Sequence, residues 1–311
     1  MKTTTVAATT TTKEESVLMP VIRHIEKRIV FLLLIIVNGA NPNGDPNSGN
    51  YPRTTSDGHG KMSANCIRRK LRNRLQDLGF RIYIISDGRY DDDINNIYDR
   101  LMADKDVAAA IESGDMEATK KAVLEKFIDA RAFGGVLAFK GKKKKGEDES
   151  GNGVSAHIRG AVSIPDAITL EPIDISEDFI TKSVNGEDRE GIASDRFGGS
   201  VYRVNHGMYL VKGSINPFFA KKNGFTQDDL EAVKAALMSL FENDESAARP
   251  AGSMVASKLI WWEGDITNNG ISRLYDSVKI NVKDGITNPS TIEDYDIKVD
   301  PDTGAQIIDC M

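Results

Sequence analysis

The nine apolar residues at 29–37 (IVFLLLIIV) constrain the fold more than any other segment of the chain. Five of them are β-branched and none is charged, and the run is too short to cross a bilayer as a helix. Such a run is typical of a strand buried on both faces in the middle of a sheet. The basic residues before it and Asn38-Gly39-Ala40 after it loosely imitate a signal peptide. The acidic residues Glu14, Glu15 and Glu26 and the β-branched content favour the central strand.

The composition is that of an acidic, soluble globular protein. The 311 residues carry a formal net charge of −6 and can bury a sizeable core, as one elaborated domain or two. This charge argues against a protein that coats nucleic acid over its whole surface, but it leaves room for one basic groove. Cys66 and Cys310 lie outside any metal-binding pattern, which favours the reducing cytoplasm. No segment is long enough to span a membrane.

Further elements follow from local patterns. Residues 1–20 are Thr-rich and aperiodic, which predicts disorder, and residues 140–153 form a charged, glycine-flanked loop. Helices are predicted at 63–78, with Gly79 just after the end, at 116–128, and at 226–241 with Thr226 as N-cap. Strands are predicted at 80–86, 200–215 and 254–262, and in short pieces within 154–200. Residues 271–282 and 295–299 are expected to finish the sheet or to pack on it.

The order of these elements predicts an α+β fold. Without the segments expected to be insertions, the chain reads strand, helix, strand, then strand, helix, strand. That is the split βαβ order of a ferredoxin-like fold, which RNA-recognition domains also use. Many unrelated proteins share this fold, so the fold alone decides nothing about function.

The helix at 63–78 carries a one-sided row of basic residues. Between Lys61 and Arg74 there are six basic residues and no acidic one. At about 100° per residue, one side carries the apolar residues Ala64, Ile67, Leu71, Leu75 and Leu78. The opposite side carries Asn65, Arg68, Arg69, Arg72 and Gln76. A solvated face generally mixes charges of both signs, so this face is predicted to bind phosphates; a plain surface or partner-protein face is the alternative.

The loop before this helix contains two turn signatures, NGDP at 43–46 and DGHG at 57–60. Glycines let backbone N–H groups approach an anion closely, as does a helix N-terminus at Ser63. Arg53 and Lys61 belong to the same stretch. The loop is therefore predicted to help hold a polyanion, although two tight turns without a ligand would explain the same residues.

Motifs for metal, cofactor or catalysis are missing from the sequence. The loop at Asp45 lacks the glycine and the glutamate of a calcium loop, and no Walker A or dinucleotide fingerprint is complete. The four histidines (His24, His59, His157 and His206) have no zinc spacing. No nucleophile–base pair stands out, so no cofactor, metal or catalytic residue is predicted.

Several segments together resemble a known family. They are NPNGDPNSGNYPR and GHGKMSANCIRRKLRN in the first part of the chain, ARAFGGVL at 130–137, HIRGAV at 157–162, NHGMYLVKGSINP at 205–217 and FENDESAARPAGSMVASKLIWWE at 241–263. They resemble the backbone subunit of type I CRISPR surveillance complexes (Cascade), most closely its type I-C branch. The resemblance covers roughly residues 28–300.

The resemblance implies a non-catalytic RNA-binding protein of antiviral defence. Copies of such a subunit stack along one CRISPR RNA into a helical filament with other Cascade subunits, and the guide bases pair with target DNA. The implied organisation is an N-terminal arm at 1–27, an RRM-like palm at 28–300 and a C-terminal tail at 301–311. A finger insertion would occupy about 88–160, and a β-hairpin thumb about 170–200.

The resemblance also implies individual RNA-binding residues. Ser63, Asn65, Arg68 and Arg72 match the positions that hold guide phosphates, and Arg69 shares their face. The other expected RNA-binding residues are Asn43, Arg53, Lys61, Phe133, Gly134, Gly135, His157 and Arg159. Ile192 or Phe197 is the expected wedge of the thumb.

Two other functions stay open. Related ferredoxin-like CRISPR proteins cut precursor RNA without metal, which would need a general base such as His59 or His157. The plainer alternative is a ferredoxin-like module that binds only protein partners.

Overall fold

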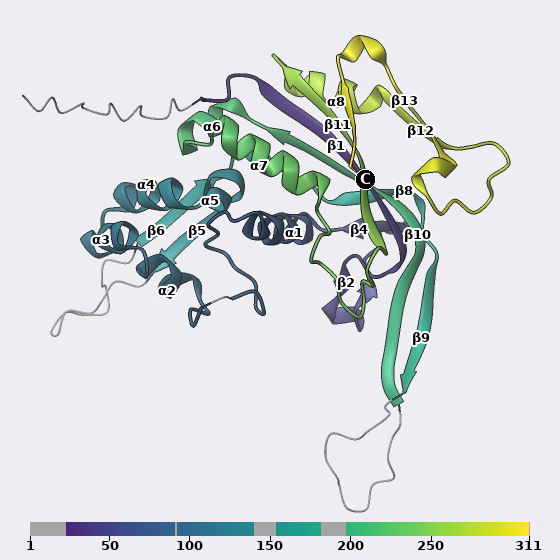
Figure 1. The fold of residues 1–311 in the computed structure, drawn as a ribbon, viewed down its shortest axis with the longest axis horizontal. Coiled ribbons are helices and arrows are strands. Elements are labelled where there is room, and N and C mark those ends of the chain that lie inside the picture. The colour runs from purple at the N-terminus through teal and green to yellow at the C-terminus, as the bar shows by residue number, and fades with distance from the viewer. Residues whose placement is uncertain (1–22, 91, 140–153, 182–196, 311) are drawn as a thin grey trace, which may run out of the picture.

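The fold is a mixed α+β structure around one large antiparallel sheet, which confirms the predicted class (Figure 1). The computed structural model describes residues 23–90, 92–139, 154–181 and 197–310. The sheet has eight strands. Along its main path lie β14 (Gln306–Asp309), β11 (Met254–Gly264), β1 (Arg28–Ala40), β10 (Phe197–Ile215), β8 (Ala167–Pro172) and β4 (His59–Met62). The strands β7 (Val162–Ser163) and β9 (Ile175–Thr181) also pair with β10.

Strand β1 is the centre of the sheet, as the apolar run predicted. It pairs with β10 on one side and with β11 on the other. Alternate residues from Ile29 to Val37 belong to the core on one face, and those from Val30 to Ile36 belong to the core on the other. Because both faces are covered, the whole run can be apolar without exposing it to water.

Two helices cover one face of the sheet. They are α1 (Ala64–Asp77) and α7 (Gln227–Met238), which confirms both predicted helices, although α7 ends earlier than 241. Ser63 and Thr226 are their N-caps, and Thr226 forms a capping box with Asp229. The short helix α6 (Pro217–Asn223) precedes α7.

The second face is covered by a smaller layer. It consists of α8 (Asn268–Asp276) and a two-stranded sheet of β12 (Val278–Val282) and β13 (Tyr295–Val299). These segments pack on the sheet, but the helix within 271–282 was not predicted. Ile271, Leu274 and Tyr275 contact the core at helical spacing, and Thr267 caps the helix. Strand β14, which lies in the segment expected to be a tail, pairs with β11 and forms an edge of the sheet.

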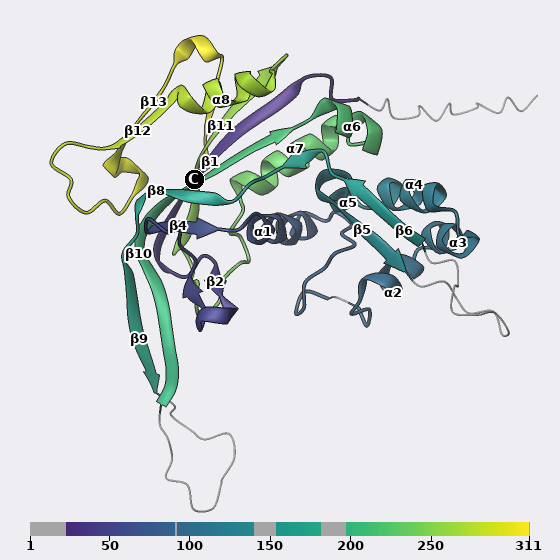
Figure 2. The same cartoon turned by 180° about the vertical axis from the view of Figure 1, so that it is seen from behind.

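A lateral subdomain stands beside α1 (Figure 2). It contains α2 (Ile97–Met102), α3 (Lys105–Ser113), α4 (Met116–Lys126), α5 (Ile128–Phe133), β5 (Gly134–Phe139) and β6 (Val154–Arg159), and it has its own core. The prediction of a strand at 80–86 is wrong. The backbone N–H groups of Tyr83 and Ile84 donate to the Asp129 carboxylate instead of to a neighbouring strand.

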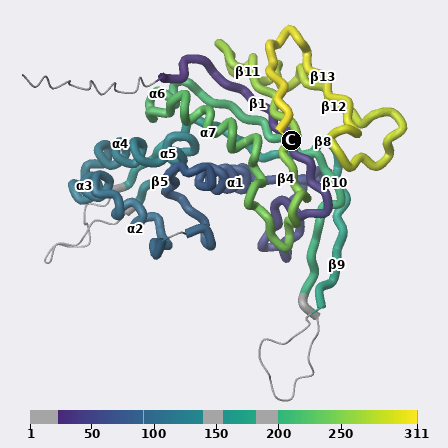
Figure 3. Tube along the Cα trace, viewed as in Figure 1, coloured from purple at the N-terminus to yellow at the C-terminus, as the bar shows by residue number. Residues whose placement is uncertain are grey.

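A long hairpin extends away from the sheet (Figures 1 and 3). It consists of β9 and the part of β10 that pairs with it, residues 197–204. Phe197 lies opposite Thr181 at the far end, and Ile192 is outside the described residues. At its near end the hairpin contacts the loop after β1. In that loop β2 (Gly44–Asp45) pairs with β3 (Tyr51–Pro52), and the 3₁₀ turn η1 (Pro46–Ser48) connects them. In the described parts of the chain, no helix combines the length and apolarity needed to span a membrane.

The close packing around β1 makes a testable prediction at Gly213 of β10. A Cβ atom there would lie 2.1 Å from Cζ of Phe31, its neighbour across the β1–β10 pair. Gly213→Ala should therefore lower the free energy of unfolding by about 1–3 kcal/mol through overpacking. The control is Gly264→Ala on β11, where the nearest atom to the new Cβ is 3.7 Å away. Urea unfolding checks both variants, and equal midpoints for the two would contradict the prediction.

Candidate nucleic-acid interface

The start of α1 is fixed by the loop that follows β1. The backbone N–H of Ser63 donates to Asn43 Oδ1 at 2.8 Å, and Ser63 Oγ accepts from the Cys66 N–H at 3.2 Å. Two of the predicted site residues are therefore in direct contact. Their hydrogen bonds set the direction in which the helix leaves the sheet.

The predicted anion position at the α1 N-terminus is occupied by the protein itself. Asp166, in the short connection before β8, accepts a hydrogen bond from the Ala64 N–H at 2.7 Å. Its second carboxylate oxygen lies 2.8 Å from Nζ of Lys61. Lys61 and the Ala64 N–H lower the pKa of Asp166, in that order of importance. Asp166 and Lys61 both remain more than a third exposed, so this contact is accessible from solvent.

The six basic residues between 61 and 74 are less available than the sequence suggested. Besides Lys61, three have carboxylate partners: Lys70 with Asp244, Arg72 with Asp129, and Arg74 with Asp77 of the same helix. The first two partners lie far along the chain, so no local pattern shows them. Of these six residues, only Arg68 and Arg69 have no carboxylate within 4.0 Å among the described residues.

Arg68 and Arg69 are consecutive residues of α1, and both are half-buried. Arg68 donates to Asn65 Oδ1 at 2.7 Å, and Arg69 donates to the Ile84 carbonyl at 2.7 Å. Burial, and next the positive charge of Arg72, lower the pKa of both guanidinium groups. Both remain charged at neutral pH, because arginine is effectively always protonated in proteins. They form the unneutralised part of the predicted face.

Arg72 was predicted to face outward, and this prediction is wrong. It is 9% exposed; Nε lies 3.0 Å from Asp129, and a terminal nitrogen donates to the Gly134 carbonyl at 3.4 Å. Its guanidinium also stacks 5.1 Å from the Phe133 ring centroid. The helical wheel placed Arg72 opposite the core of the main sheet, but the lateral subdomain supplies a second core on that side. Burial raises the pKa of Asp129, and Arg72 with two backbone N–H groups opposes that shift.

Phe133, Gly134 and Gly135 form the junction behind Arg72. Gly134 has φ +67°, and a Cβ atom on it would lie 2.1 Å from the Ile158 carbonyl oxygen. A Cβ atom on Gly135 would lie 1.9 Å from the Tyr83 hydroxyl. Both glycines are therefore required for close packing between α5, β6 and the chain near residue 83.

Arg53 and His59 have partners within the loop before α1. Arg53 lies 3.1 Å from Asp45, and His59 Nδ1 lies 3.3 Å from Asp57. In the described ranges, no group of three His, Cys, Asp or Glu residues is placed to bind a metal ion.

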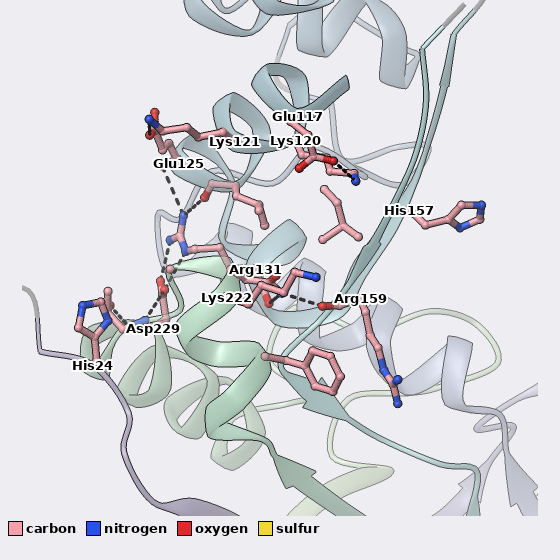
Figure 4. A pocket seen from close by; sticks show the side chains of 16 residues that line it. His24, Glu117, Lys120, Lys121, Glu125, Arg131, His157, Arg159, Lys222 and Asp229 are labelled. Atoms are coloured by element: carbon pink, nitrogen blue, oxygen red, sulfur yellow. Dashed lines mark hydrogen bonds and ion pairs between the residues drawn. The ribbon is translucent and has the colours of Figure 1, made fainter. Parts of the chain in front are cut away.

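His157 and Arg159 belong to a different surface. Their exposed side chains leave β6 and line a cavity with α4 and α6, which no residue of α1 lines (Figure 4). The guanidinium of Arg159 lies 4.5 Å from the ring centroid of Phe219 on α6. The structure therefore separates these two predicted residues from the arginines of α1.

Comparison with known proteins identifies the family. The family model of CRISPR-associated protein Cas7 matches residues 27–300. The chain belongs to the Cas7 family. The CRISPR-associated protein Cas7 of Haloferax volcanii is 25% identical over 236 residues, which are 72% of this chain and 67% of that protein.

Two solved structures are similar to this Cas7 family member. One is a chain of a CRISPR RNA-guided surveillance complex, with a TM-score of 0.39 and 15% identity over 75% of this chain and 68% of that chain. The other is a chain of such a complex in a pre-nicking state, with a TM-score of 0.42 and 14% identity over 75% of this chain and 77% of that chain.

The buried pair Arg72–Asp129 makes a prediction for this Cas7 family member. Asp129→Ala should lower the free energy of unfolding by roughly 3–5 kcal/mol, because it leaves a buried guanidinium without its partner. The double variant Arg72→Met, Asp129→Leu should recover part of that loss, because neither charge then stays buried. Asp106→Ala, which breaks an exposed pair with Lys126, is the control and should leave the urea midpoint unchanged. A midpoint for Asp129→Ala equal to that of the control would contradict the prediction.

Proposed function

We propose that this chain is a structural subunit of a CRISPR surveillance complex and binds CRISPR RNA on α1. The observation that carries the proposal is the adjacent pair Arg68 and Arg69, the two basic residues at 61–74 without a carboxylate partner in the described structure. The planar guanidinium suits phosphate oxygens, and two neighbouring forks suit successive phosphates of one strand. Family membership supports RNA as the polyanion.

The other predicted residues take different parts in this proposal. Asn43 and Ser63 hold the helix start, and Asn65 and Lys61 border the two arginines. Arg53 and the Gly-rich loop offer further contacts beside them. Arg72 with the Phe133-Gly134-Gly135 junction supports the site from behind. His157 and Arg159 act at the separate cavity.

We also propose the hand-like organisation of the type I-C backbone subunit. The order β11, β1, β10, β8 supports a ferredoxin-like palm: the fourth, first, third and second strands of a split βαβ unit stand in that order. The lateral subdomain would be the fingers, and the long hairpin the thumb. In this proposal several copies follow one guide in the cytoplasm, contact other Cascade subunits and present bases to target DNA without catalysing a reaction.

The first test measures RNA affinity against salt concentration. The double variant Arg68→Ala, Arg69→Ala should weaken binding of single-stranded RNA. It should also flatten the slope of log K against log[salt] by roughly 1.4, since each single-strand phosphate contact contributes about 0.7. Fluorescence anisotropy between about 50 and 200 mM salt gives both quantities.

The matched control is Arg273→Ala, Lys279→Ala. It removes two exposed charges from α8 and β12 on the other face of the sheet. If both double variants keep the wild-type affinity and slope, α1 does not bind the RNA.

The endonuclease alternative has one supporting contact, the His59–Asp57 pair. Precursor RNA that stays intact after incubation with the protein in EDTA would argue against this alternative.

A second prediction concerns Asp166. Its carboxylate holds Lys61 and the Ala64 N–H, two groups that a guide phosphate could use. Asp166→Asn should therefore tighten RNA binding by roughly two- to fivefold, which corresponds to an exposed ion pair of about 0.5–1 kcal/mol, and should steepen the salt slope. Asp296→Asn, which breaks the exposed pair with Lys298, is the control. Weaker or unchanged binding by Asp166→Asn would show that Asp166 does not compete with RNA.

A further inference from the structure

A cavity of about 690 Å³ lies between the lateral subdomain and the start of α7 (Figure 4). Its walls come from α4, the end of α5, β6 and α6. This volume is in the range of sites that bind nucleotides and other small ligands. None of the residues of α1 that carry the proposed RNA contact lines it.

The cavity wall carries an excess of positive charge. Each of its three carboxylates is already held by one cation: Glu117 by Lys120 at 2.7 Å, Glu125 by Lys121 at 3.9 Å and Asp229 by Arg131 at 2.7 Å. Arg159 and Lys222 also line the cavity, and neither has a carboxylate within 4.0 Å in the portion of the chain that the structure describes. Two positive charges of the cavity wall therefore have no acidic partner among the described residues.

One of these two cations is held in place by an aromatic ring and not by a carboxylate of the described residues. The Arg159 guanidinium stacks on the Phe219 ring, which leaves its N–H edges free for hydrogen bonds. The buried amide of Asn223 donates to the carbonyls of Arg159 at 2.7 Å and Arg131 at 3.3 Å. This amide fixes the end of α6, which carries Lys222, against β6, which carries Arg159. A guanidinium held in this way is suited to a phosphate group.

We propose that this cavity binds phosphates of single-stranded nucleic acid through Arg159 and Lys222, as a second contact separate from Arg68 and Arg69. The choice of nucleic acid as the source of the phosphate rests on the proposed function. The cavity supplies charge and shape but reads no base, so binding here is independent of sequence.

The test compares two neighbouring lysines of α6 in the full-length chain. Lys222→Glu reverses a charge in the cavity, whereas Lys221→Glu makes the same change one residue away, outside the cavity wall. Both are placed in the wild type and in the Arg68→Ala, Arg69→Ala variant, and the affinity for a short single-stranded oligonucleotide is measured. Lys222→Glu should weaken binding at least threefold more than Lys221→Glu in both backgrounds. Equal effects of the two lysine variants would overturn the inference.

The four variants separate this inference from the proposed function. If the α1 variant weakens binding while Lys222→Glu behaves as Lys221→Glu, the cavity site is wrong and the α1 site stands. If the α1 variant binds as the wild type while Lys222→Glu weakens binding, the cavity is a site and the α1 proposal fails. Arg159→Lys, which keeps the charge but loses the planar fork, should weaken binding less than Arg159→Glu. An equal loss for these two would contradict the role of Arg159.

Discussion

The buried ion pair between Arg72 and Asp129 connects the two halves of this protein. Arg72 belongs to α1 on the main sheet, and Asp129 belongs to α5 of the lateral subdomain. The same carboxylate accepts the N–H groups of Tyr83 and Ile84, and the same guanidinium reaches the Gly134 carbonyl. One contact therefore fixes α1, the chain near residue 83 and the β5–β6 hairpin relative to one another. Removing two charges from water is costly, so this pair is better understood as a determinant of geometry than as a source of stability.

Both proposed phosphate-binding surfaces depend on that junction. Arg68 lies one helical turn before Arg72 on α1, and Arg159 lies opposite Gly134 on β6. A shift of the lateral subdomain would move the two surfaces relative to each other. A strand of nucleic acid that contacts both would then meet a different spacing of charges. The glycines at 134 and 135 keep this spacing fixed, because a side chain on either would push β5 away from its neighbours.

Local patterns in the sequence predicted the central elements well. Strand β1 has an apolar run that only a doubly covered strand accommodates, and α1 and α7 have apolar stripes with suitable N-caps. The errors concern groups whose partners are distant in sequence. The pattern of residues 80–86 predicted a strand, but two of its backbone N–H groups donate to the carboxylate of Asp129 and not to a neighbouring strand. Arg72 was predicted to be exposed because a helical wheel assumes that a helix packs against one core, whereas α1 lies between two cores. No local sequence pattern indicated that Asp166 lies at the start of α1 or that Lys222 lines the cavity.

The edge strand β14 also has a consequence for assembly. It pairs with β11 over residues Lys258–Trp261 and takes its place as the outer strand of the large sheet, so the edge strand there is only four residues long. An open edge offers the same hydrogen bonds to any strand, including one from another copy. A subunit that is proposed to add copy by copy along a guide needs contacts of defined geometry. Pairing between the sheet edges of two copies would join them without any guide RNA. Because so short an edge strand offers few hydrogen bonds, β14 opposes guide-independent polymerisation there.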